Sequence, residues 1–118
     1  MKITNPKKIS SKDLIVFDLD GTLAQTKSTM DREMSALLAQ LLATKKVAVI
    51  GGGKYGLFKI QFLKGLKVPR ERLPHLYLFP TTGTSFYRYQ SGWKNVYSLP
   101  LTKNEVQQTF KAFRDAMK

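Results

Sequence analysis

A short apolar run near the start of the chain leads directly into two closely spaced aspartates. The run L-I-V-F at positions 14–17 is followed by D-L-D-G-T at positions 18–22. Such a run is typical of a strand buried on both faces, as in a parallel sheet that helices cover. Gly21 gives the backbone freedom to turn away just after the strand. The pattern therefore predicts an α/β fold in which a buried strand carries two carboxylates at its carboxyl end.

The two carboxylates belong to Asp18 and Asp20, which stand two positions apart. In an extended chain their side chains project from the same side of the backbone. Neighbouring carboxylates repel and are costly to desolvate unless a cation pairs with them, and Mg²⁺ prefers oxygen ligands of this kind. We therefore expect a metal site at Asp18 and Asp20, beyond the carboxyl end of the strand. The alternative is a solvated turn, because D-x-D-G is also common turn chemistry.

The string F-D-L-D-G-T-L at positions 17–23 resembles the first motif of the haloacid dehalogenase-like phosphotransferases. The likeness continues through K-V-A-V-I-G-G-G at 46–53 and L-Y-L-F-P-T-T-G-T at 76–84. In this order the segments are similar to the amino-terminal half of phosphomannomutases and their capped phosphatase relatives. The resemblance implies a three-layer Rossmann-like core with a parallel sheet, a β-hairpin and a carboxyl-terminal helix. It also implies a partial core over residues 1–100, and a terminal helix over 101–118 that starts a missing cap.

The resemblance also assigns roles to individual residues. Asp18 would be the nucleophile that becomes an aspartyl-phosphate, and Asp20 would protonate the departing oxygen. Mg²⁺ would be held partly by the Asp18 carboxylate and the Asp20 backbone carbonyl. The family's second motif ends its strand with a phosphate-binding Ser or Thr, whereas this strand ends in a glycine turn. We expect the N–H groups of that turn, with the adjacent lysine, to bind phosphate through Gly51, Gly52, Gly53 and Lys54.

The later motifs of the family, a Lys and a further acidic pair, have no counterpart after residue 54. The acids beyond that point are isolated: Glu71, Glu105 and Asp115. The leading expectation is a Mg²⁺-dependent phosphohydrolase or phosphomutase that acts on a phosphate ester, by analogy a sugar phosphate, and that is incomplete in this chain. A non-catalytic binding or assembly module of the same fold is the alternative, and a basic nucleic-acid-binding domain is a third reading.

The same glycine turn satisfies the form of a dinucleotide-binding fingerprint, Gly51-x-Gly53-x-x-Gly56. It lies on the second strand-to-helix turn rather than the first, and Glu71 is too close to serve as the expected acidic residue. Leu57 also stands where a phosphate-binding loop needs Lys. A tight turn is therefore the preferred interpretation.

The chain has 118 residues and a formal net charge of +12. Such an excess permits binding to nucleic acid. The basic residues are scattered, however, and only the region from 86 to 94 mixes them with aromatic residues, so we do not expect a nucleic-acid partner. The positive charge is explained equally well by the attraction of a phosphorylated small molecule, or by an acidic half of the protein that is missing from this chain.

The sequence contains no Cys, no apolar run long enough to cross a membrane and no apolar leader behind its basic start. These absences lead us to expect no disulfide framework, no thiolate metal site, no membrane partner and a cytoplasmic location.

Apolar periodicity predicts a first helix that starts at Ser28-Thr29 and a second helix over 55–63. Strands are expected at 47–50 and 76–79, and this alternation indicates right-handed crossovers in a parallel sheet. Residues 85–89 and 94–98 flank a turn with Gly and predict a hairpin.

Thr102 and Glu105 form the sequence signature of a capping box, which opens a final helix. The helix carries an apolar stripe of Val106, Phe110, Phe113 and Met117. Nothing later in the sequence can cover this stripe. We therefore expect it to contact the sheet, a second copy of the chain or the missing carboxyl-terminal half.

Overall fold

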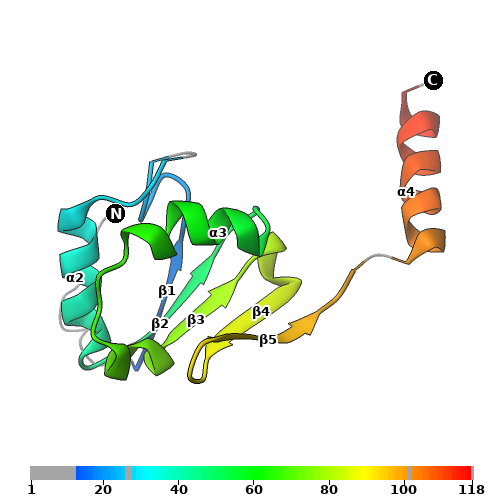
Figure 1. Cartoon of the computed structure of the whole chain (residues 1–118). Helices are drawn as coiled ribbons and strands as arrows, with labels where there is room; N and C mark the ends of the chain where they lie inside the picture. Colours follow the sequence, from blue (N-terminus) through cyan, green and yellow to red (C-terminus); the bar gives the residue numbers. More distant parts are fainter. Residues whose placement is uncertain (1–12, 26–27, 101, 118) are drawn as a thin grey trace.

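The computed structural model describes residues 13–25, 28–100 and 102–117. Within these ranges five strands form one mixed sheet in the order β1-β2-β3-β4-β5 (Figure 1). Neighbouring strands are parallel from the first to the third, and the last two continue the sheet in antiparallel pairing. The strands are β1 (Leu14–Asp18), β2 (Lys46–Ile50), β3 (Leu76–Phe79), β4 (Ser85–Tyr89) and β5 (Trp93–Ser98). The α/β fold is confirmed, and the expected hairpin extends the sheet.

The hydrophobic core lies between one face of the sheet and the helices α2 (Arg32–Leu42) and α3 (Tyr55–Gln61). Alternate residues of β1, β2 and β3 point into this core because side chains alternate between the faces of a strand. The helices contribute mainly large apolar side chains. Burying a side chain of this size stabilises the fold by about 1.5–3 kcal/mol. The core includes Phe17, Val47, Val49, Leu76 and Leu78 from the strands and Leu38, Leu42, Phe58 and Phe62 from α2 and the end of α3.

The expectation that β1 is buried on both faces is wrong for the described residues. Leu14 is 50% exposed and Val16 is 60% exposed, whereas Phe17 is buried in the core. The side chains of Leu14 and Val16 point to the face of the sheet opposite the core helices, and no described element buries them there. A run of four apolar residues does not reveal which of them face inward, and here only alternate residues do.

The start of α2 also differs from the expectation. The helix begins at Arg32, and the carboxylate of Asp31 caps it by accepting a hydrogen bond of 2.8 Å from the backbone N–H of Met34. Thr29 instead donates its hydroxyl to the carbonyl of Ile60 at 3.1 Å. The segment before the helix is therefore bonded to the end of α3, and this tertiary contact prevents an earlier helix start.

The final helix α4 (Lys103–Ala116) begins with the expected capping box. The backbone N–H of Glu105 donates to Oγ1 of Thr102, and the backbone N–H of Thr102 donates to Oε1 of Glu105, both at 3.1 Å. Figure 1 shows α4 standing apart from the sheet. The side chains of Phe110 and Phe113 on this helix are exposed. None of the described helices is both long and apolar enough to cross a membrane.

Candidate active site

The chain reverses sharply after β1, and this turn displays the two aspartates. Leu19 is buried, and its backbone N–H donates to the carbonyl of Ile50 at 3.0 Å. Its own carbonyl accepts hydrogen bonds from the backbone N–H groups of the turn, while Gly21 adopts a φ of 76°, which favours glycine. Asp18 and Asp20 flank Leu19 and are both exposed. The turn thus places both carboxylates at the carboxyl end of β1.

Asp20 is held by a residue that sequence reasoning missed. Nε2 of Gln61 donates a hydrogen bond of 2.8 Å to Oδ1 of Asp20. The side chain of Gln61 is only 1% exposed, and it lies at the end of α3 between buried aromatic residues. The sequence does carry a sign of this residue's special role. Gln61 is a polar residue three positions after Phe58, on the apolar side of a helix.

The glycine turn that follows β2 lies beside the aspartates. The sheet register pairs Asp18 with Ile50, so both strands end at the same edge of the sheet. A Cβ atom on Gly51 would lie 3.2 Å from the ring of Phe58, which explains why this position holds glycine. Lys54 precedes α3 and is exposed. The topology therefore brings the four predicted phosphate-binding residues to the edge that carries Asp18 and Asp20.

A second turn supports the glycine turn from the other side. The backbone N–H groups of Thr81 and Thr82 donate to the carbonyls of Gly53 and Gly51, each at 2.8 Å. Both threonines have positive φ values, 50° and 56°. A β-branched residue in this region is strained, so the contact between the two turns is maintained against a local cost.

The carboxylates suit one kind of metal ion better than others. Among the described residues no group of three or more His, Cys, Asp or Glu side chains could hold a metal ion. Mg²⁺ needs fewer protein ligands, because it usually keeps several waters and binds one or two carboxylates together with substrate phosphate. The donor set of Asp18 and Asp20 fits such a partly hydrated Mg²⁺ ion. It does not fit a metal that requires a complete cage of protein ligands.

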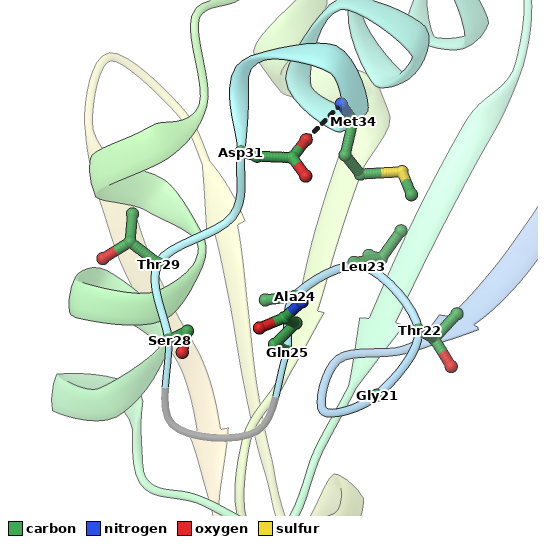
Figure 2. A pocket seen from close by; sticks show the side chains of 9 residues that line it. All are labelled: Gly21, Thr22, Leu23, Ala24, Gln25, Ser28, Thr29, Asp31 and Met34. Atoms are coloured by element: carbon green, nitrogen blue, oxygen red, sulfur yellow. Dashed lines mark hydrogen bonds between the residues drawn. The ribbon is translucent and has the colours of Figure 1, made fainter.

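A pocket of about 320 Å³ lies next to this site (Figure 2). The loop from Gly21 to Gln25 forms one side, and the segment with Ser28, Thr29 and Asp31 forms the other. The aspartates of the site do not line it. A second cavity of about 540 Å³ lies beyond the glycine turn, between Lys54 and the stacked rings of Tyr55 and Tyr87 on one side and the end of β5 on the other. Burial, and then the charge of Tyr87, raise the pKa of Tyr55.

The fold and the site together define a Rossmann-like α/β domain with a D-x-D-G-T turn after its first strand. The model of the haloacid dehalogenase-like hydrolases matches residues 15–117. The chain therefore belongs to the haloacid dehalogenase-like hydrolase family, which confirms the resemblance seen in its motifs.

Two curated relatives are phosphomannomutases. The chain is 33% identical over 76 residues to phosphomannomutase 1 of Mus musculus and 32% identical over 76 residues to that of Homo sapiens. Each alignment covers 64% of this chain and 28% of the relative. The aligned part of this chain therefore spans less than a third of the length of these relatives.

Solved structures show the same fold. An amino-terminally truncated, IMP-bound IMP-nucleotidase of Plasmodium falciparum superposes with a TM-score of 0.67 at 15% identity, over 89% of this chain and 33% of that one. A haloacid dehalogenase-like hydrolase of B. subtilis superposes with a TM-score of 0.63 at 20% identity, over 89% of this chain and 34% of that one. At such identities the likeness establishes the fold alone.

Proposed function

We propose that this chain carries the phosphoryl-transfer site of a Mg²⁺-dependent phosphohydrolase or phosphomutase. One observation carries the proposal: in a chain of this hydrolase family, Asp18 and Asp20 lie at the carboxyl end of β1, at the sheet edge where the glycine turn of β2 begins. Nucleophile, proton donor and phosphate-binding groups would then share one edge of the sheet.

The reaction would proceed in two displacements. A carboxylate oxygen of Asp18 attacks phosphorus, the ester P–O bond breaks, and the leaving oxygen takes a proton from Asp20. The resulting aspartyl-phosphate is then attacked by water or by a second hydroxyl, whose proton returns to Asp20. The products are the free alcohol with inorganic phosphate, or a transferred phosphoryl group, and Asp18 is restored as a carboxylate.

The glycine turn supports the proposal because it has unused donors. The backbone N–H groups of Gly52 and Gly53 donate to no group among the described residues, whereas that of Gly51 is bonded to Phe79 in the sheet. Free N–H groups in a turn, with the exposed ammonium of Lys54 nearby, suit an oxyanion. They would take the place of the hydroxyl that the family uses in its second motif.

The Asp18 carboxylate and the Asp20 backbone carbonyl would hold Mg²⁺. When bound, this ion would stabilise the negative charge of the transferring phosphoryl group.

The proposed substrate is a phosphorylated small molecule, with a sugar phosphate as the first candidate. The name of the curated relatives, phosphomannomutase, supports this class. We further propose that residues 1–100 form the partial core and that 101–118 begin a cap domain. The separation of α4 from the sheet supports this division.

The test is turnover of nitrophenyl phosphate and of a hexose phosphate by the chain with Mg²⁺. Asp18→Asn should reduce turnover to background, a loss of at least about 10³-fold. Asp13→Asn, which alters another exposed acid of the same strand region, is the matched control and should leave the rate unchanged. Turnover that survives Asp18→Asn would contradict the proposal.

A second candidate is a non-catalytic binding module. It is favoured by the glycines at positions 51–53, which stand where the family's second motif has a phosphate-binding hydroxyl. This candidate predicts that phosphate or a hexose phosphate binds to the chain without any turnover.

A further inference from the structure

We infer that Gln61 is a positioning residue that fixes the side chain of Asp20 for proton transfer. The inference rests on the proposed function, because it concerns the residue assigned there as the proton donor. Its basis is the hydrogen bond of 2.8 Å from Nε2 of Gln61 to Oδ1 of Asp20, which joins segments 41 residues apart.

The burial of Gln61 is costly and needs a reason. Its side chain is 1% exposed, and its Oε1 atom is buried without a hydrogen-bond partner among the described residues. An unsatisfied buried oxygen destabilises a fold, and an apolar side chain of the same length would avoid that cost. The stability of the core therefore does not explain why an amide stands here.

Asp20 does not need Gln61 for solvation either. The residue is exposed, so water can satisfy its carboxylate. The hydrogen bond instead restricts the rotation of the carboxylate. Oδ1 is occupied by Gln61, while Oδ2 has no hydrogen bond to any described residue and is available to a reacting group.

Both ends of this hydrogen bond are anchored. The backbone carbonyl of Gln61 accepts from Met30 at 2.7 Å, and Phe58 and Phe62 on either side of it are fully buried. At the other end, the backbone of Asp20 forms an isolated parallel β-bridge with Ala24. The backbone N–H of Gly21 donates to the carbonyl of Ala24 at 2.7 Å. The side-chain torsions of Asp20 are thus the remaining freedom, and Gln61 removes it. A proton donor held in this way is preorganised.

The experiment compares two phosphate esters that differ in their need for a proton. A hexose phosphate has a poor leaving group that must be protonated, whereas nitrophenolate departs without a proton. Gln61→Met keeps the length of the side chain and removes its donor. We expect kcat for the hexose phosphate to fall by on the order of tenfold with little change in KM, and kcat for nitrophenyl phosphate to fall less than about twofold. Gln40→Met, at an exposed Gln of α2, is the matched control and should change neither rate.

A double-mutant cycle separates positioning from a merely structural role. If Gln61 acts through Asp20, then Gln61→Met should cause no further loss in an Asp20→Asn background. Equal losses on the two esters, additive losses in the cycle, or a change in KM alone would overturn the inference. These outcomes need a parent chain that turns over the esters. Absence of turnover by the parent would instead overturn the proposed function.

The hydrogen bond itself can be tested without turnover. In nuclear magnetic resonance spectra the side-chain amide protons of Gln61 should exchange slowly with water, and Asp20→Ala should abolish that protection while the core signals stay unchanged. Fast exchange in the parent chain, similar to that of Gln40, would overturn the inference even in an active enzyme. This measurement also covers the case in which Gln61→Met fails to fold.

Discussion

Thr82 donates its backbone N–H to the carbonyl of Gly51 at 2.8 Å while its own φ is 56°. A β-branched residue thus occupies left-handed backbone space to join the turn after β3 to the glycine turn after β2. The phosphate-binding turn of the proposed site is braced from the neighbouring strand rather than by its own sequence.

Thr82→Gly should stabilise the fold by about 1 kcal/mol, because glycine adopts this φ without the steric cost that a β-branched residue carries. Thr84→Gly is the control, since Thr84 has a φ of −76° and its hydroxyl donates to the carbonyl of Thr81. That variant should be destabilised. Denaturant unfolding measures both, and a loss of stability in Thr82→Gly would show that the turn is not strained.

Gly51→Ala should destabilise the protein by about 1–3 kcal/mol through overpacking. The added methyl group would lie 3.2 Å from two ring atoms of Phe58, which is fully buried in the core. Gly52→Ala is the matched control, because the nearest atom to its Cβ is Oγ1 of Thr82 at 4.0 Å. Thermal unfolding of the two variants should differ clearly, and equal midpoints would refute this packing.

Val16→Thr should change the free energy of unfolding by less than about 0.5 kcal/mol, because Val16 is exposed on the outer face of β1. The same substitution at Val49, in the core, places a hydroxyl among apolar side chains and should cost about 1–3 kcal/mol. A large cost at Val16 would mean that another surface covers this face of the sheet in solution.

Acid should loosen the start of α4. The backbone hydrogen bond of Thr102, followed by its side-chain hydrogen bond, lowers the pKa of Glu105 below its ordinary value of 4.5. A carboxyl whose pKa is lower in the folded state stabilises that state above the unfolded pKa, and this contribution is lost as pH falls through the folded pKa. The protection factors of the amide protons in the first turn of α4, which are corrected for the intrinsic pH dependence of exchange, should therefore fall below about pH 4.5. Glu105→Gln should remove this pH dependence, and an unchanged pH profile in that variant would argue against the assignment.

Features set by neighbouring residues could be predicted from the sequence. The capping box of Thr102 and Glu105 and the strand at 76–79 match the structure because their signals are local. The position of Asp18 and Asp20 at the end of a strand also follows from adjacent residues.

Features set by tertiary contacts could not be predicted. The late start of α2 depends on the bond from Thr29 to Ile60, and the exposed face of β1 depends on which face of the sheet the helices cover. The role of Gln61 was missed for the same reason, since its partner Asp20 lies 41 residues away. In each case the deciding partner is distant in sequence, and hydrophobic periodicity carries no information about it.

The most direct measurement asks whether Asp18 becomes phosphorylated. The chain would be incubated with Mg²⁺ and nitrophenyl phosphate, quenched with borohydride, which reduces an aspartyl-phosphate to homoserine, and analysed by peptide mass spectrometry. We predict homoserine at position 18, dependent on the ester and absent when the ester is omitted. Reduction at another aspartate, or turnover with position 18 unmodified, would contradict it.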